Sequence, residues 1–333
     1  MEKIAVLGAG SWGTTLALHL HKNGYKVTLW EFFPDYAKEL QQKRENLKFL
    51  PGFKIPSGVR ITPNIKEAAE GTKVIVLAVP SHVMRSVTSF LKPFNLQDVL
   101  LVSVAKGIEN KTFLRMSQVI ARELPASKNN IVVLSGPSHA EEVVRNIPTT
   151  VVAASRNLKK AEHIQKIFMS PYLRVYTNTD VVGVELGGSL KNIIAIACGM
   201  SDGLGFGDNT KAALMTRGMH EITGLGVAMG AKPKTFAGLS GIGDLITTCI
   251  SRHSRNRNYG EMLGKGLTPK QALSKMIMVV EGIRTTKSAH ALAGKYKIEM
   301  PITEQVYAVL FKGKKAKNAG GDLMMREAKP EHR

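Results

Sequence analysis

The sequence predicts an α/β domain with a mostly parallel sheet over residues 1–180, followed by an all-α domain over residues 181–333. In the first part, short and continuously apolar runs alternate with helical patterns, as in a parallel sheet that helices cover on both faces. After Asp180 the helical patterns continue, and no convincing strand follows. We therefore expect the boundary at about residues 178–182, without a long flexible linker.

The apolar runs define the expected strands of the sheet. They cover residues 4–7, 27–30, 74–79, 100–105 and 131–134, with 150–154 and 173–176 as expected edge strands. Between the first two strands, residues 14–22 place their apolar side chains on one helical face and stop at Asn23 and Gly24. In the second part the expected helices are 180–200, 209–229, 268–279, 284–294 and 302–312.

The chain is strongly basic, with 46 Lys and Arg residues against 26 Asp and Glu residues and a formal net charge of +20. Such a charge suits nucleic acid, an anionic membrane surface or an anionic small molecule. The basic stretch RHSRNR (252–257) has no aromatic interleaving beyond Tyr259 and no recognised nucleic-acid motif. We therefore expect no nucleic-acid partner, whereas weak association with an anionic membrane stays open.

No apolar run reaches the roughly 18 residues of a membrane-spanning helix. The N-terminus passes directly into a strand and a glycine turn, unlike a signal peptide, and two cysteines do not make a disulfide scaffold. A cytoplasmic location is the resulting expectation. The sequence contains neither H-E-x-x-H nor paired C-x-x-C, so we expect no metal.

The stretch GAGSWG (8–13) is a G-x-G-x-x-G turn that follows a strand and opens a helix. Gly8 would permit the tight turn, Gly10 the close approach of a pyrophosphate, and Gly13 close packing of helix on strand. The helix N-terminus, including Ser11 and Trp12, would then face the diphosphate of a dinucleotide. This context predicts a Rossmann domain, and the alternative is a glycine-rich turn without a ligand.

Glu31 follows the second expected strand, where a carboxylate would accept hydrogen bonds from the adenosine ribose and favour NAD. Phe32 and Phe33 come next and could stack on adenine, but they cannot hold a 2′-phosphate. A solvated strand end is the alternative for Glu31.

Further candidate ligand-binding residues follow the later strands, since ligands of open α/β sheets bind at the carboxyl ends of the strands. Lys106 follows one apolar run, and Gly136 with Ser138 follows another. Lys106 is the charged residue among these strand ends and could touch a substrate anion. From spacing alone, an exposed lysine at a strand end fits equally well.

Lys191 lies in an apolar helical stretch, VELGGSLKNIIAIACGM (184–200), where a charge is costly unless it is compensated. Gly187 and Gly188 lie four and three positions earlier, so they share its helical face. We expect this bare strip to leave room for another molecule or for backbone. The alternative is close domain packing, with the ammonium reaching water.

Three further segments supply side chains that could bind an anionic substrate or contact Lys191. GLSGIGD (238–244) is a glycine loop that delivers Asp244, and SRNRN (254–258) offers guanidinium groups that suit a small phosphate. Glu281 and Gly282 follow the apolar pair Val279 and Val280.

Taken together, the chain resembles the NAD(P)-dependent glycerol-3-phosphate dehydrogenase family over nearly its whole length, with motifs in family order. The matching stretches are GAGSWGT (8–14), FLPG (49–52), VPSH (79–82), AKGIE (105–109), SGPSHA (135–140), ELGGSLKN (185–192), GMSDGLGFGDNTKAALMTRG (199–218), SGIGDL (240–245), SRNRNYG (254–260), VVEG (279–282) and MPIT (300–303).

The resemblance implies reversible reduction of dihydroxyacetone phosphate to sn-glycerol 3-phosphate, which supplies glycerophospholipid synthesis, with NAD(P)H as cofactor. We expect a homodimer, although nothing in the sequence itself gives the oligomeric state. The lysine that matches Lys191 is the family's acid/base. Substrate-binding positions match Lys106, Gly136, Ser138, Lys191, Asp244, Ser254, Arg255 and Asn256, and cofactor-binding positions match Ser11, Trp12, Lys106, Ala140, Arg255, Val279 and Glu281.

One position departs from the family pattern. Members that prefer NADPH often carry a basic residue just after the second strand, where this chain has Glu31, Phe32 and Phe33. Two other functional classes also stay open from the sequence: a hydride-transferring enzyme of the same architecture that acts on a β-hydroxyacid, and a non-catalytic basic protein that binds anionic lipid or nucleic acid.

Overall fold

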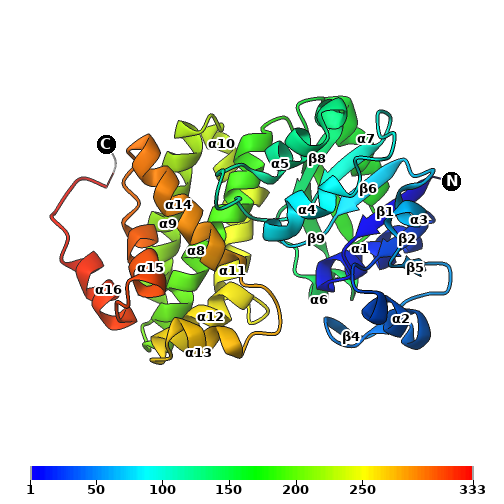
Figure 1. Ribbon diagram of the computed structural model, residues 1–333. Coiled ribbons are helices and arrows are strands. Elements are labelled where there is room, and N and C mark those ends of the chain that lie inside the picture. Colours follow the sequence, from blue (N-terminus) through cyan, green and yellow to red (C-terminus); the bar gives the residue numbers. More distant parts are fainter. Residues whose placement is uncertain (1, 332–333) are drawn as a thin grey trace.

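An eight-stranded sheet dominates the first half of the computed structural model, which describes residues 2–331 (Figure 1). Its strand order is β10-β9-β8-β7-β6-β1-β2-β5. The strands are β1 (Lys3–Leu7), β2 (Lys26–Trp30), β5 (Arg60–Thr62), β6 (Val74–Leu77), β7 (Leu100–Ser103), β8 (Ile131–Ser135), β9 (Thr149–Ala154) and β10 (Leu173–Asn178). Neighbouring strands are parallel except β8 and β9, so the predicted mostly parallel sheet is confirmed.

Two details of the sheet differ from the expectation. The run at 150–154 was expected at an edge, but β9 lies between β8 and β10 and is almost fully buried. The true second edge is β5, a three-residue strand whose polar ends gave no apolar run. A separate hairpin of β3 (Glu45–Asn46) and β4 (Leu50–Lys54) was missed for the same reason.

Helices cover both faces of the sheet. They are α1 (Ser11–Lys22), α2 (Pro34–Lys43), α3 (Ile65–Ala69), α4 (Met84–Ser89), α5 (Met116–Glu123), α6 (Ala140–Val143) and α7 (Leu158–Phe168), with 3₁₀ turns η1 (Ser81–Val83) and η2 (Pro125–Asn130). Because side chains alternate along a strand, Ile4 and Val6 of β1 join one apolar cluster and Ala5 and Leu7 join the other.

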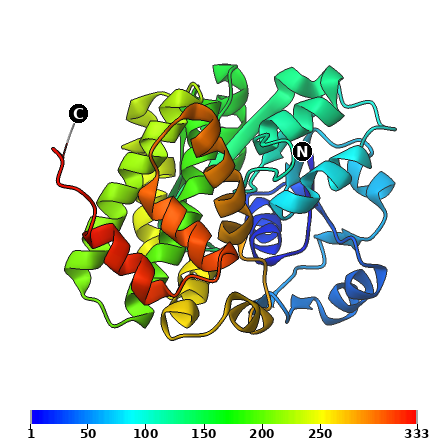
Figure 2. The same cartoon turned by 60° about the vertical axis from the view of Figure 1, so that its left-hand side comes forward.

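The second half is helical and is built around α8 (Val181–Gly203), which runs through the middle of its neighbours (Figures 1 and 2). The remaining elements are α9 (Asp208–Ala228), α10 (Pro233–Phe236), a π-helical turn η3 (Leu239–Gly243), α11 (Asp244–Ile250), α12 (Arg255–Gly264), α13 (Pro269–Ser274), α14 (Glu281–Tyr296), α15 (Pro301–Phe311) and α16 (Ala316–Met324). By length and composition α8 could cross a membrane, but 89% of its apolar window is buried inside the protein. It is therefore the core helix of this half.

Several helix predictions need correction. The helix expected over 268–279 is only α13, because residues 275–280 form a connecting segment to α14. The basic stretch at 254–258 was placed in none of the expected helices, but it forms the start of α12. The Ser254 hydroxyl caps this helix by accepting a hydrogen bond from the backbone N–H of Arg257. Its many charged residues hid the helical period. The helix α16 was not expected at all.

A buried ion pair ties α8 to the sheet half. Arg115, which precedes α5, donates to the carboxylate of Glu185 on α8, and both residues are buried. The Ser117 backbone N–H and hydroxyl also donate to this carboxylate, at 2.7 and 2.6 Å. These bonds satisfy a charge that would otherwise be costly to bury, and they fix the start of α8 against the first half.

Other parts of the protein fill the glycine strip beside Lys191. A Cβ atom on Gly187 would lie 2.4 Å from the Ser240 carbonyl oxygen of η3, and one on Gly188 would lie 2.6 Å from the Ser135 hydroxyl of β8. Of the two occupants that the sequence left open, the structure shows backbone at Gly187, whereas the side chains of Ser135 and Lys106 lie against Gly188. The glycines let η3 pack directly on α8, and η3 leads into Asp244.

We expect Gly187→Ala to destabilise the fold by about 1–3 kcal/mol, because the added methyl overpacks against η3. The gain in helix propensity, about 1 kcal/mol, offsets part of this cost. Denaturant unfolding of this variant and of Gly294→Ala, where a Cβ would meet no atom within 4 Å, measures the difference. Equal stability of the two variants would contradict the close approach of η3.

Candidate active site

Two lysines share one aspartate between the two halves of the chain. The Lys191 ammonium on α8 donates to Asp244 Oδ1, and the Lys106 ammonium donates to Asp244 Oδ2 at 2.7 Å. Lys106 also donates to the Gly136 carbonyl oxygen at 2.9 Å. Asp244 is 1% exposed and Lys191 is 5% exposed. Three sequence-predicted residues that are far apart in the chain thus form one cluster of charges.

The environment of Lys191 changes its acidity. The pKa of Lys191 is lowered from 10.5 to about 7, chiefly because the ammonium is buried; the charge of Asp244 opposes this shift, and the charge of Lys106 adds to it. Desolvation and a like charge both disfavour the ammonium form. A lysine with a pKa near neutrality can both donate and accept a proton under ordinary conditions.

Two residues of the cluster escaped the sequence analysis. The Thr248 hydroxyl accepts a hydrogen bond from the Lys191 ammonium, and it lies one turn after Asp244 on α11. Asn192 accepts from Asn256 at 2.9 Å and donates to the Lys106 carbonyl oxygen at 3.5 Å. The i, i+4 spacing of Asp244 and Thr248 was the available signal, since such residues share a helix face.

Ser254, Arg255 and Asn256 lie next to this cluster at the start of α12. Asn256 is buried between Asn192 and the backbone N–H of Gly282. Arg255 is exposed and its guanidinium donates to the Val279 carbonyl oxygen at 3.4 Å. Its guanidinium is therefore held by the segment before α14 and remains accessible to an anion.

The segment after β8 also reaches this edge. Gly136 has a φ of +137°, a conformation that favours glycine. The Ser138 hydroxyl donates to the Gly136 carbonyl oxygen at 2.9 Å, the same oxygen that Lys106 contacts. Ala140 opens α6, and its carbonyl oxygen accepts from the Thr15 hydroxyl of α1 at 3.4 Å. This segment therefore lies between the lysine cluster and the glycine turn.

The glycine turn after β1 fits the diphosphate of a dinucleotide. Gly8 has a φ of +108°, and a Cβ on Gly13 would lie 1.9 Å from the Gly8 carbonyl oxygen, so both positions require glycine. A Cβ on Gly10 would meet no protein atom within 4 Å. Gly10 also precedes α1 without a side-chain cap, and the N–H groups of Ser11 and Trp12 at the helix start are thus available to an anion.

Glu31, Phe32 and Phe33 follow β2 beside this turn. Glu31 is 7% exposed, and its Oε1 accepts from the Phe33 backbone N–H at 3.1 Å. Phe33 is 63% exposed and meets Phe32 edge to face, with ring centroids 5.1 Å apart. An exposed aromatic pair next to a carboxylate suits the adenosine end of a dinucleotide.

Glu281 joins the two halves across the same edge. The carboxylate of Glu281, the first residue of α14, accepts from the Ser81 backbone N–H at 2.8 Å and from the Ser81 hydroxyl at 2.5 Å. Val279 lies two residues earlier and binds Arg255 through its carbonyl. Sequence reasoning could not place Ser81 in this contact because the two residues are 200 positions apart.

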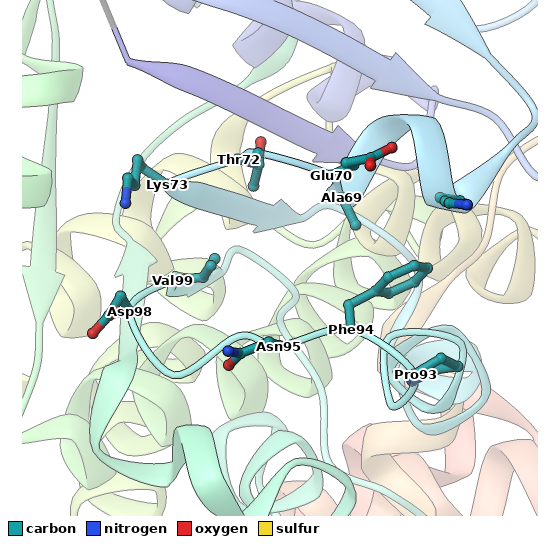
Figure 3. Close-up of a pocket in the computed structure, with 11 residues that line it drawn as sticks. Ala69, Glu70, Thr72, Lys73, Pro93, Phe94, Asn95, Asp98 and Val99 are labelled. Carbon is teal, nitrogen blue, oxygen red and sulfur yellow. The ribbon is translucent and has the colours of Figure 1, made fainter.

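A separate pocket of about 420 Å³ lies at the other end of the strands (Figure 3). Lys73 precedes β6 and Val99 precedes β7, so the pocket opens at their amino ends. Its lining includes Glu70, Asp98 and Phe94 and none of the site residues predicted from the sequence. Within residues 2–331, no group of three His, Cys, Asp or Glu side chains is placed to hold a metal ion.

A G-x-G-x-x-G turn after the first strand of a mostly parallel sheet, joined to a helical half that carries a buried lysine, is typical of an NAD(P)-dependent dehydrogenase. Sequence profiles of the NAD-dependent glycerol-3-phosphate dehydrogenase N-terminus and C-terminus match residues 3–161 and 180–320. The chain belongs to this family.

Similar proteins cover the whole chain. It is 54% identical over 329 residues to glycerol-3-phosphate dehydrogenase [NAD(P)+] of Thermoanaerobacter sp. (strain X514), covering 99% of this chain and 98% of that protein. The corresponding enzyme of Chlorobium phaeobacteroides (strain BS1) is 52% identical over 99% of each chain. The crystal structure of glycerol-3-phosphate dehydrogenase from Coxiella burnetii superposes with a TM-score of 0.94 at 40% identity, covering 98% of this chain and 99% of that one.

Proposed function

We propose that this chain catalyses the reversible NAD(P)H-dependent reduction of dihydroxyacetone phosphate to sn-glycerol 3-phosphate, with Lys191 as general acid and base. Family membership supports the reaction. The observation that carries the role of Lys191 is its buried ammonium, held by Asp244 and Thr248 with a pKa of about 7. The product would supply glycerophospholipid synthesis.

The cofactor would lie along the carboxyl edge of the sheet. Gly8, Gly10, Ser11, Trp12 and Gly13 would hold its diphosphate, and Glu31, Phe32 and Phe33 its adenosine. Lys106, Ala140, Arg255, Val279 and Glu281 are the further positions that we assign to cofactor binding. When bound, the reduced nicotinamide supplies a hydride for the C2 carbonyl of the substrate.

Lys191 would complete the reduction by donating one proton from Nζ to the C2 oxygen of the substrate, which leaves the alcohol and a neutral amine. Asp244 orients that ammonium, and Thr248 holds it from a second side. In the reverse direction the neutral amine removes the hydroxyl proton. A pKa near 7 serves both directions, because either form is then accessible near neutral pH.

The substrate phosphate is assigned to the start of α12. Arg255 would bind it through its accessible guanidinium, which suits phosphate oxygens bidentately. Ser254 and Asn256 would shape this end of the site, and Lys106, Gly136, Ser138 and Asp244 the end near the carbonyl. This division places the phosphate away from Lys191, so that the carbonyl is presented to the ammonium.

Assembly and location complete the proposal. A homodimer is supported by an exposed apolar face on α11, where Ile246 is 41% and Ile250 is 55% exposed. The exposed lysines 312, 315 and 317 beside α16, together with the net charge of +20, favour weak association with an anionic membrane. We also assign the protein to the cytoplasm. The burial of α8 inside the protein agrees with this location.

Lys191→Met should lower the turnover of dihydroxyacetone phosphate by about 10²–10⁴-fold, the usual contribution of a general acid, while NADH still binds. Asp244 keeps its ion pair with Lys106 in this variant. The absorbance change at 340 nm measures turnover, and fluorescence titration measures NADH binding. The same absorbance assay with a β-keto acid tests the alternative substrate class. Lys270→Met on α13 is the matched surface control. Turnover within a few-fold of the unchanged chain would exclude this role for Lys191.

Arg255→Ala should raise the KM for dihydroxyacetone phosphate by about 10–100-fold, because a charge-assisted hydrogen bond contributes about 1.5–3 kcal/mol. The effect on kcat should be small. Arg252→Ala, an exposed arginine three residues earlier, serves as the control for lost surface charge. If both variants keep the original KM, the phosphate does not bind to Arg255.

A further inference from the structure

One buried ring nitrogen beside the candidate site has no partner. His139 lies between Ser138 and Ala140 in the segment that follows β8, and it is the N-cap residue of α6. Within residues 2–331, the buried Nε2 atom of His139 forms no hydrogen bond. Buried polar atoms without a partner are rare in native proteins, and each requires an explanation. A bound molecule with a hydrogen-bonding group at this place would supply the missing partner.

The other hydrogen bond of the ring determines which nitrogen carries the proton. The His139 ring hydrogen-bonds to the backbone of Thr247 on α11, and this bond favours the protonated ring, as donation to a carbonyl oxygen does. Because Nε2 forms no bond, the donor to Thr247 is Nδ1. The neutral ring then carries its proton on Nδ1 and a lone pair on Nε2. Nε2 is therefore a hydrogen-bond acceptor.

The surroundings keep this ring neutral. The pKa of His139 is lowered from 6.5, chiefly because the ring is buried. The charges of Lys191 and Lys106 add to this shift, and the charge of Glu141 opposes it. A neutral imidazole avoids the repulsion that a third cation beside the two ammonium groups would add. Near neutral pH, Nε2 thus accepts hydrogen bonds and does not donate them.

His139 adjoins both ends that we assign to the substrate. The charges of the two lysines that share Asp244 act on its ring. The centroid of the His253 ring lies 6.0 Å from that of His139, and His253 belongs to the loop before α12. Glu141, two positions after His139, acts electrostatically on Arg255. The ring therefore lies near the cluster assigned to the carbonyl and near the loop that leads to the arginine assigned to the phosphate.

The proposed substrate has one group that fits an unpartnered acceptor. In dihydroxyacetone phosphate, the carbonyl oxygen and the oxygens of the ionised phosphate accept hydrogen bonds, and the C1 hydroxyl is the donor. With the carbonyl at Lys191 and the phosphate at Arg255, this hydroxyl has no other assigned partner. A substrate without it would leave Nε2 buried and unpaired, which is costly.

We propose that His139 Nε2 accepts a hydrogen bond from the C1 hydroxyl of dihydroxyacetone phosphate and thereby selects substrates that carry this hydroxyl. The inference rests on the proposed function, and it deepens that function by assigning a specificity-determining residue. The bond from Nδ1 to Thr247 orients the ring, and Nε2 binds the substrate.

The test compares kcat/KM for dihydroxyacetone phosphate with kcat/KM for its 1-deoxy analogue, hydroxyacetone phosphate, which lacks only the C1 hydroxyl. We expect the unchanged chain to favour dihydroxyacetone phosphate by about 10–100-fold, the effect of leaving one buried acceptor unpaired. His139→Asn keeps an amide donor near the position of Nδ1 but has no atom at the position of Nε2. It should reduce the preference to about threefold or less, because no acceptor is then left unpaired.

His139→Gln is the matched variant, because its side-chain amide oxygen can lie near the position of Nε2. It should retain more of the preference than His139→Asn. His163→Asn, which changes an exposed histidine on α7, is the surface control and should leave both kcat/KM values unchanged. Thermal unfolding verifies that all three variants fold.

An unchanged preference in His139→Asn would overturn the inference. This includes the case in which both kcat/KM values fall together, as for a residue that acts only through Lys191. A preference lost equally in His139→Gln and His139→Asn would also overturn it, because an acceptor at the position of Nε2 would then be without effect.

NADH binding distinguishes a second donor, the carboxamide of the nicotinamide. We expect fluorescence titration to give the same Kd for NADH in His139→Asn and in the unchanged chain. A higher Kd in His139→Asn, with an unchanged preference between the two phosphates, would assign Nε2 to the carboxamide and overturn the inference.

Failure of the unchanged chain to reduce either phosphate would contradict the proposed reaction rather than the role of His139. The Kd values of the two phosphates, measured by calorimetry with NADH present, then decide. A lower Kd for dihydroxyacetone phosphate that is lost in His139→Asn would support recognition of the hydroxyl, and equal Kd values in the unchanged chain would overturn it.

Discussion

The carboxylate of Asp244, shared between the ammonium groups of Lys191 and Lys106, is the interaction on which the site depends. Two cations and one anion in a buried place would be unstable without close pairing. The three residues come from α8, from the loop after β7 and from the start of α11. Their pairing therefore requires that both halves of the chain meet at one point.

The backbone around this cluster is arranged to permit that meeting. Gly187 lets the backbone of η3 approach α8, and Gly188 leaves room for the Ser135 side chain of β8. The turn η3 ends where α11 begins, at Asp244. A chain of amides then extends from Lys106 through Asn192 and Asn256 to the backbone of Gly282. Because the side-chain amides of Asn192 and Asn256 both take part in these hydrogen bonds, α8, α12 and α14 are held in fixed relative positions.

The sequence was informative where a local pattern has one physical meaning. Continuous apolar runs identified most of the strands. The glycine turn was found between β1 and α1 as predicted, because Gly8 and Gly13 are required by the backbone itself. Lys191 attracted attention because a charge in an apolar helix is costly. The same reasoning could not identify Thr248, since a threonine on a helix is ordinary until its partner Lys191 is known. It also could not identify the contact of Ser81 with Glu281.

Long-range arrangement was the other limit. The antiparallel pairing of β8 with β9 reverses the chain direction within the sheet, and no periodicity within residues 150–154 carries that information. The glycine strip was expected to accept another molecule or backbone, and only the fold could decide between them. The start of α12 was hidden because its charged and polar residues show no apolar helical period.

The central claim is that burial beside Lys106 makes Lys191 a proton donor near neutral pH, with Asp244 opposing part of that shift. An NMR titration of lysines labelled at the side chain, assigned with Lys191→Met, measures the pKa directly. We predict a value of about 7 for the unchanged chain and a lower value in Asp244→Asn, because the carboxylate favours the ammonium. A pKa near the ordinary 10.5, or a rise in Asp244→Asn, would contradict the account.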